Sequence, residues 1–172
     1  MSYTTREAAI EDADAIAHVH VESWRSTYAG IIPDAFLASL NPAERAERWR
    51  SAFATSNFRI FVAEDDGRVV GFVSGGRLRE PLETYDAELY AIYLLRDHQG
   101  SGLGRALVLM LVNALRSEGL RSMVVKVLEK NPAVLFYRRL GAQLVARELI
   151  EIGGARLDEL VLGWIELDTL SV

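Results

Sequence analysis

The chain has 172 residues, half of them hydrophobic and a quarter charged, which is the balance of an ordinary globular protein and argues against disorder. Its formal net charge of -5 provides no basic surface, so nucleic acid is not expected as a partner. It has no cysteine, which excludes disulfides, thiolate metal sites and a cysteine nucleophile.

Domain organisation and location can be predicted from the same overview. A chain of this length favours a single domain covering residues 1–172. No apolar run is long enough to span a bilayer, and the N-terminus lacks the basic and apolar segments of a signal peptide. We therefore expect a cytoplasmic protein with no membrane partner.

The first third of the chain predicts one short strand followed by helices. Residues 3–8 fit a strand, and apolar residues then recur every three or four positions over 10–28, which predicts a helix. A short helical piece is expected over 34–40, and Asn41-Pro42 predicts the start of a helix that continues to about residue 53. The aromatic residues of these helices are expected in the core, with the alternative that one of them borders an acceptor pocket: Trp24, Tyr28 and Trp49.

The middle of the chain predicts strands and then the longest helix. Asp66-Gly67 joins apolar runs at 59–63 and 68–73, which is typical of an antiparallel hairpin. A further strand is expected over 88–95. A glycine-rich turn then leads into a helix from about residue 103, whose apolar stripe continues to Leu115.

The last third predicts the parallel part of the sheet. The continuous apolar run at 122–128 is typical of a strand buried on both faces and parallel to its neighbour. Asn131-Pro132 predicts the start of another helix, and Gly153-Gly154 predicts a hairpin between strands at 143–152 and 156–165. The expected fold class is α+β, with a mixed, mostly antiparallel sheet, one parallel β-α-β crossover and flanking helices.

The glycine-rich turn is the strongest candidate for a functional site. It reads Gln99-Gly100-Ser101-Gly102-Leu103-Gly104 at a predicted helix start, where unpaired N–H groups and the helix dipole attract a phosphate or pyrophosphate. A P-loop is excluded because Arg105 follows the last glycine instead of lysine. The glycine spacing also differs from the dinucleotide fingerprint, and no serine here has the spacing of a hydrolase elbow. A plain strand-to-helix turn would need only one glycine.

This turn resembles the acyl-CoA site of the GCN5-related N-acetyltransferase (GNAT) superfamily. Its signature, Gln/Arg-x-x-Gly-x-Gly/Ala, is matched by Gln99, Gly102 and Gly104. The preceding strand ELYAIYLL and the later segment NPAVLFYRRLGAQL also resemble family motifs, and the resemblance extends from about residue 58 to the end. Two positions depart from the pattern, since Arg96 stands where proline is frequent and His98 where an aromatic residue is usual.

The resemblance implies a single GNAT-like domain with acetyl-CoA as co-substrate and no metal. It assigns the pyrophosphate to the turn, and the pantetheine arm to the backbone of Ile92 and Leu94. It also implies that the side chain of Asn131 contacts the cofactor and that Tyr137 donates a proton to the CoA sulfur. The turn residues that it carries over are Gln99, Gly100, Ser101, Gly102, Leu103, Gly104 and Arg105.

Transfer to an amine needs a base, because an alkylamine with a pKa of about 10.4 is protonated at neutral pH. Glu88 is the candidate, since strict alternation would place it on the same strand face as Tyr90, Ile92 and Leu94. Two alternatives stay open. In the first, Glu88 is only a solvated carboxylate at the strand start. In the second, a chain of water molecules acts as the base in its place.

The resemblance therefore predicts an N-acetyltransferase that works by direct attack of a primary amine on acetyl-CoA in a ternary complex. The expected partner is a small-molecule or peptide amine. The alternative is a non-catalytic acyl-CoA-binding or sensing domain of the same fold, which would keep the turn without needing Tyr137 or a base. The apolar alternation of the last two strands is compatible with a homodimer.

Overall fold

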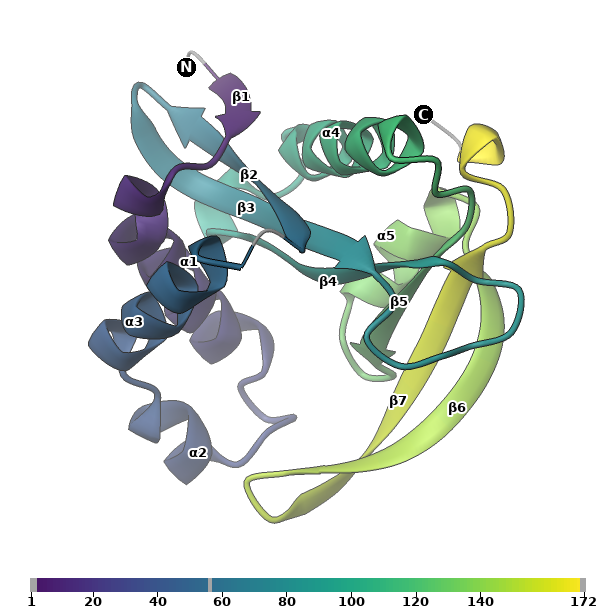
Figure 1. The fold of residues 1–172 in the computed structure, drawn as a ribbon. Helices are drawn as coiled ribbons and strands as arrows, with labels where there is room; N and C mark the ends of the chain where they lie inside the picture. Colours follow the sequence, from purple (N-terminus) through teal and green to yellow (C-terminus); the bar gives the residue numbers. More distant parts are fainter. Residues whose placement is uncertain (1–2, 56, 171–172) are drawn as a thin grey trace.

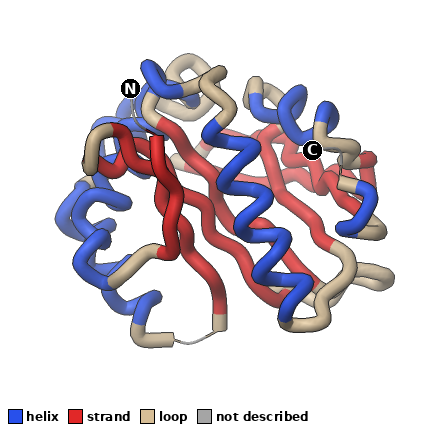
Figure 2. The backbone as a smooth tube through the Cα atoms, turned by 90° about the horizontal axis from the view of Figure 1, so that it is seen from above, coloured by secondary structure: helices blue, strands red, loops and turns tan. Residues whose placement is uncertain are grey.

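The computed structural model describes residues 3–55 and 57–170, and its seven strands form one sheet with helices on both faces (Figures 1 and 2). In spatial order the strands are β1-β2-β3-β4-β5-β7-β6, and every neighbouring pair is antiparallel except β4 and β5. The strands are β1 (Tyr3–Glu7), β2 (Phe58–Asp65), β3 (Arg68–Arg77), β4 (Ala87–Leu94), β5 (Met123–Leu128), β6 (Gln143–Ile152) and β7 (Ala155–Trp164). The helices are α1 (Ala13–Thr27), α2 (Asp34–Ser39), α3 (Pro42–Phe53), α4 (Leu103–Ser117) and α5 (Ala133–Arg139), with 3-10 turns at Ile10–Asp12, Arg96–His98 and Leu167–Thr169. The α+β prediction with one parallel crossover is confirmed.

The two faces of the sheet have separate cores. On one face, the apolar stripe of α4 packs against the sheet, with Leu107, Leu111 and Leu115 completely buried. Figure 2 shows this helix lying across the strands. On the opposite face, α1 and α3 cover β2, β3 and β4 through Ile16, Trp49 and Phe72. The amphipathic periodicity of these helices and the β-rich sequence of the strands account for both layers.

A bulge in β4 shapes the centre of the sheet. Ser74 of β3 is opposite Ala91, but the next residue, Gly75, is opposite Leu89, so Tyr90 is an extra residue in β4. A bulge bends the strand and increases its twist. The parallel pairing of β4 with β5 accordingly covers only Ala87–Leu89, and the two strands separate beyond it.

The bulge also overturns one prediction about strand faces. Ile92 and Leu94 pack into the core under α4, whereas Glu88 lies on the opposite face with Ala91 and Tyr93. The expected common face for Glu88, Ile92 and Leu94 is therefore wrong, because the extra residue at Tyr90 shifts the alternation by one position.

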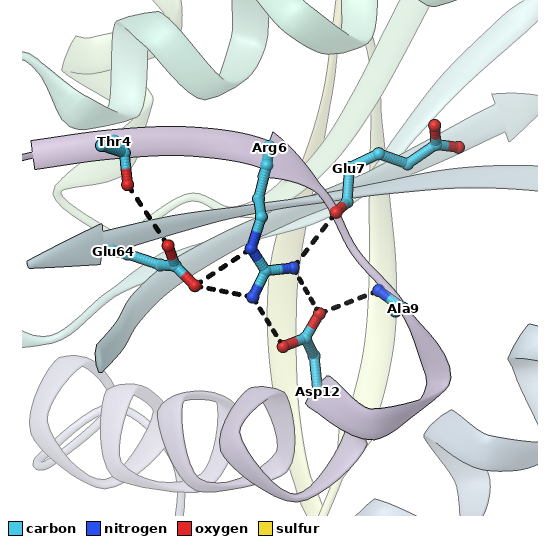
Figure 3. A network of polar contacts seen from close by, with 6 residues as sticks. All are labelled: Thr4, Arg6, Glu7, Ala9, Asp12 and Glu64. Atoms are coloured by element: carbon cyan, nitrogen blue, oxygen red, sulfur yellow. Dashed lines mark hydrogen bonds and ion pairs between the residues drawn. The ribbon is translucent and has the colours of Figure 1, made fainter. Parts of the chain in front are cut away.

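A polar network fastens the N-terminal strand to the rest of the sheet (Figure 3). The guanidinium of Arg6 lies between two carboxylates, at 2.7 Å from Asp12 and 2.6 Å from Glu64. Asp12 also accepts a hydrogen bond from the amide of Ala9 at 2.8 Å, and Glu64 accepts one from the hydroxyl of Thr4 at 3.2 Å. Arg6 thus joins β1, β2 and the start of α1, which sets where the first helix leaves the sheet.

The β6–β7 hairpin extends past the sheet toward α2 (Figure 1). At its tip, Gly153 contacts Phe36 so closely that a Cβ on the glycine would lie 2.7 Å from the Phe36 Cβ. The two segments enclose a small apolar cluster with Tyr28, Ile32 and Leu128. Over the part of the chain that the structure describes, no helix combines the length and the hydropathy that a bilayer span requires.

Candidate active site

The glycine-rich turn lies at the N-terminus of α4, as the sequence predicts. Gly100 and Gly102 have φ angles of 72° and 89°, in the left-handed region that favours glycine, and a Cβ on either would point into open space. Gly102 is the N-cap of α4, and no side chain of the described residues caps the helix. Because the first N–H groups of a helix have no partner within it, the turn offers several amide donors to an anion.

Side-chain contacts hold the segment that leads into this turn. The Gln99 amide donates to the carbonyl of Leu94 at 3.1 Å, and the Ser101 hydroxyl donates to the carbonyl of His98 at 2.6 Å. The ring of His98 contacts Asp65, at the end of β2, with 3.1 Å between Nε2 and Oδ2. Gln99 and Ser101 therefore fix the backbone of the turn through their side chains, and its amides remain available for a ligand.

A cleft of about 600 Å³ runs from the turn into the gap between β4 and β5, a size typical of small-molecule sites. Its lining includes most of the predicted site residues: Ile92, Leu94, Gln99, Gly100, Gly102, Gly104, Arg105, Asn131 and Tyr137. Three predicted residues, Ser101, Leu103 and Glu88, are not among those that line it. The cleft thus joins residues that are distant in the sequence into one site.

The cleft fits the parts of an acyl-CoA molecule. The turn presents amide donors where a pyrophosphate would need them, and within the described part of the chain no strand pairs with the edge of β4 beyond Leu89 on the β5 side. An extended arm could form hydrogen bonds along that edge, as an added strand does. The carbonyl of Leu94 already accepts hydrogen bonds from Gln99 and Ser23, so the arm would use other groups of this segment.

Tyr137 lies in α5 at the inner end of the cleft. Its side chain is buried, and its ring packs edge to face against Phe136 and Trp164. Burial raises the pKa of the Tyr137 hydroxyl well above the ordinary value for tyrosine, since the phenolate would be poorly solvated there. The hydroxyl is therefore protonated and able to donate at neutral pH.

Asn131 connects α5 to the opposite side of the cleft. Its side-chain oxygen accepts a hydrogen bond from the amide of Ala133 at 2.9 Å, which caps the start of α5. Its amide group donates to the hydroxyl of Tyr28 at 3.1 Å, and that hydroxyl is 3.5 Å from the hydroxyl of Tyr93. In this structure Asn131 thus orients Tyr28, while its predicted contact with the cofactor stays a prediction.

Tyr28 and Tyr93 belong to the site. Tyr28 was expected in the core, with the alternative that it borders an acceptor pocket, and the sequence did not single out Tyr93. Both line the cleft. Tyr28 is also buried in an apolar cluster, so the core prediction for it is confirmed. No local motif marks these two residues, because they meet only when α1, whose C-cap is Tyr28, packs against the face of β4 that carries Tyr93.

Glu88 is held in an ion pair. Its side chain is only 3% exposed and contacts the guanidinium of Arg79, through Nη2 and also through Nε at 3.2 Å. The backbone amide of Arg79 donates to the same carboxylate at 3.4 Å, and the guanidinium stacks on the ring of Tyr90 at 4.4 Å. To act as a base, Glu88 would first have to leave this pair.

His20 has no role in the cleft but is central to the layer behind it. It is buried among Trp24, Trp49, Phe72 and Tyr93, and its Nδ1 has no hydrogen-bond partner within the described residues. Burial lowers the pKa of His20 to about 3, with a smaller contribution from the nearby guanidinium of Arg45. His20 is therefore neutral in the folded protein.

Comparison with known sequences identifies related proteins. Residues 18–142 match the model of the acetyltransferase (GNAT) family. The chain is 46% identical over 169 residues to the uncharacterized N-acetyltransferase YuaI of Bacillus subtilis, covering 98% of this chain and 96% of that protein. It is 30% identical over 149 residues to an L-methionine sulfoximine/L-methionine sulfone acetyltransferase of Pseudomonas paraeruginosa, covering 84% of this chain and 82% of that protein.

Comparison with solved structures gives the same picture. The structure of yncA from Salmonella typhimurium with acetyl-CoA matches with a TM-score of 0.74 and 26% identity, over 98% of this chain and 95% of that one. The paia N-acetyltransferase of Thermoplasma acidophilum in complex with coenzyme A has a TM-score of 0.77 and 22% identity, over 95% and 98% of the two chains. The second match bears on the fold alone.

Proposed function

This chain belongs to the acetyltransferase (GNAT) family, and we propose that it transfers the acetyl group of acetyl-CoA to the primary amine of a small acceptor of the amino acid class. The N-acetyltransferase activity and the acetyl-CoA donor are those of the family. The acceptor class is supported by relatives named for it, the methionine sulfoximine/sulfone acetyltransferase and, at 28% identity over 111 residues, the L-amino acid N-acyltransferase MnaT of Escherichia coli.

One observation carries this proposal. A single cleft connects the amide donors of the turn, the unpaired edge of β4 and the Tyr137 hydroxyl. These are the three features that an acyl-CoA needs in sequence, an anion site, an extended channel and a proton donor near the thioester. The gap between β4 and β5 also opens toward the face that carries Tyr28 and Tyr93, so an acceptor can approach from the opposite side.

In the proposed mechanism the acceptor attacks directly while both substrates are bound. Its uncharged amine forms a bond to the carbonyl carbon of the thioester, and the carbon–sulfur bond breaks. Tyr137 donates its hydroxyl proton to the departing thiolate and regains one from the nitrogen as the amide forms. The raised pKa of Tyr137 makes the phenolate an effective acceptor for that returning proton.

The test is a panel of amines with acetyl-CoA, followed by detection of the free CoA thiol. L-Methionine sulfone, L-methionine sulfoximine, several L-amino acids and n-butylamine cover the acceptor class and a simple amine. Thiol release with the amino acids is expected. If CoA stabilises the protein thermally while no amine is acetylated, the molecule is a sensor and the proposal is wrong.

Two further expectations belong to this proposal. A cytoplasmic location is supported by the absence of cysteine, since the fold has no disulfide that would need an oxidising compartment. A homodimer is compatible with β6 as an edge strand of the sheet. Light scattering of the purified chain measures its oligomeric state directly.

A further inference from the structure

The sheet face opposite α4 carries a group of charged side chains next to the cleft. Two of them are basic, and both have acidic partners. Arg79 pairs with Glu88, and Lys126 of β5 lies 3.0 Å from Glu80 and 3.4 Å from Glu148 of β6. The positive charges on this part of the face are therefore already matched.

Glu159 of β7 lies on the same face and has no such partner. In the sheet register it is opposite Leu128 of β5 on one side and Glu148 of β6 on the other. Its side chain is partly buried, yet it forms no hydrogen bond or ion pair with any of the residues 3–55 and 57–170. A partly buried carboxylate that forms no direct ion pair is costly unless a ligand supplies the partner.

The position of Glu159 relates it to the acceptor side of the cleft. Leu128, its neighbour across the sheet, packs in the same apolar cluster as Tyr28, and Tyr28 and Lys126 both line the cleft. The charged and titratable groups that face Glu159 are Lys126 and Glu148, with Glu88, Arg79 and Tyr28 further contributing to its electrostatic environment. Burial raises the pKa of Glu159 above the ordinary value for glutamate, and the charges of Glu148 and Glu88 add to this effect, while Lys126 and Arg79 oppose it.

We infer that Glu159 binds the ammonium group of the acceptor and removes its proton before attack. This rests on the proposed transfer to a primary amine. The ammonium form enters the cleft, gives one proton to the Glu159 carboxylate and becomes the neutral amine. After the carbon–nitrogen bond forms and the carbon–sulfur bond breaks, Tyr137 protonates the thiolate and recovers the second nitrogen proton. Glu159 then releases its proton to solvent, so that one ammonium ion and acetyl-CoA yield an amide, CoA and one proton.

Neither Glu159 nor Glu88 is among the described residues that line the cleft, and it is the difference in ion pairing that favours Glu159 for this role. Glu88 is enclosed and already neutralised by Arg79, so an incoming ammonium ion would have to displace a guanidinium. Glu159 is the carboxylate on this face that gains a partner when an amine binds. Its raised pKa also brings it closer to the pH at which a general base is effective.

The experiment compares Glu159→Gln with the wild-type chain, using L-methionine sulfone and n-butylamine as acceptors. The KM for the amine is expected to rise by roughly tenfold or more, because a charge-assisted contact is lost, and kcat to fall by roughly 10²-fold. The KM for acetyl-CoA should not change. Glu159→Asp retains the carboxylate and is expected to recover part of the loss.

The matched control is Glu148→Gln, which removes a carboxylate directly opposite Glu159 on β6 and should leave both KM values unchanged. The pH profile of kcat/KM for the amine adds a second readout. Wild-type activity is expected to fall at acidic pH as Glu159 becomes protonated, and this acidic limb should disappear in Glu159→Gln.

Two outcomes separate this inference from the proposed function. If the wild-type chain acetylates an amine while Glu159→Gln keeps the same amine KM and the same acidic limb, Glu159 has no such role. If the wild-type chain acetylates no amine, the proposed function fails and this inference fails with it. Thermal stabilisation of each variant by CoA verifies that the donor site is folded.

Discussion

The two ends of the cleft differ in how far apart in the sequence their residues lie. The predicted pyrophosphate site at the donor end is contained in residues 94–105, which form one strand end, one turn and the first turn of α4. The acceptor end combines Tyr28 after α1, Tyr93 of β4 and Lys126 of β5, and the inference above adds Glu159 of β7. A donor site made from one turn is fixed by local backbone geometry, whereas the acceptor end forms only when the sheet register and the α1 packing are both in place.

The largest expected effect is at Tyr137, where the two ends meet. Tyr137→Phe keeps the ring that packs against Phe136 and Trp164 but removes the proton donor. We expect kcat to fall by roughly 10²-fold or more with both KM values unchanged, as measured by release of the CoA thiol. A nearly normal rate would show that the thiolate obtains its proton elsewhere.

Acid should weaken the packing on the acceptor side more than the donor turn, because α1 packs against the sheet there through the neutral side chain of His20. Its folded-state pKa lies below its ordinary value of 6.5, so its contribution to stability is complete above pH 6.5 and is lost as the pH falls toward 3. Each pH unit below 6.5 should cost about 1.4 kcal/mol of the free energy of unfolding.

His20→Phe tests this by removing the titrating group while keeping an aromatic ring. In urea unfolding at several acidic pH values, the variant should lose stability with a smaller slope than the wild-type chain. His18→Gln, at an exposed position of the same helix, is the control and should keep the wild-type slope. If the free energy of unfolding falls with pH at the same slope in all three chains, protonation of His20 does not destabilise the fold.

The donor end should respond to a change in one backbone conformation. Gly102→Ala places a Cβ on a residue with φ of 89°, which costs roughly 1–2 kcal/mol. We expect lower stability and a raised KM for acetyl-CoA, with the amine KM unchanged. Gly154→Ala, at a φ of 82° in the β6–β7 turn, carries the same strain away from the donor end and should lower stability alone. A raised acetyl-CoA KM in both variants would contradict a local role for the turn.

The smallest expected effect concerns the support of the donor turn by His98. His98→Ala removes the contact with Asp65, a largely buried pair whose side chains are 19% and 20% exposed. The KM for acetyl-CoA should rise about two- to fivefold, the range of a pair worth 0.5–1 kcal/mol, with kcat unchanged. Asp65→Ala should do the same, and the double variant should add nothing further. Additive effects would show that the two residues act separately.

The contrast between the local donor turn and the dispersed acceptor end also explains which features can be predicted from the sequence. Helices, strands and the crossover follow from periodicity and from turn residues, and the donor turn follows from the spacing of Gln99, Gly102 and Gly104. The bulge at Tyr90 has no comparable signal, and it reverses the face of every β4 residue beyond it. For this reason the prediction that Glu88 shares a strand face with Ile92 and Leu94 is wrong, whereas the prediction that the turn lies at the start of a helix is confirmed.

The acceptor residues lie beyond sequence reasoning for a related reason. Glu159 is one acidic residue in a run of charged and apolar residues. That it forms no direct ion pair with the described residues is visible only in the structure, where Lys126 and Arg79 pair with other carboxylates. Tyr28 similarly satisfies the helical pattern of a core residue. Its hydroxyl accepts a hydrogen bond from Asn131, which lies 103 residues later in the sequence.

The close contact of Gly153 with Phe36 has a consequence for how this molecule can evolve. Among the described residues, the hairpin tip and α2 pack in the same apolar cluster as Tyr28, which lines the cleft, and neither supplies a residue to the donor turn. Insertions at the hairpin tip or between α1 and α2 would therefore alter which amines enter while leaving capture of acetyl-CoA intact. Sequence changes that alter acceptor specificity are expected to accumulate in these two segments. New substrates would then be acquired through changes in loop length, while the transfer reaction stays the same.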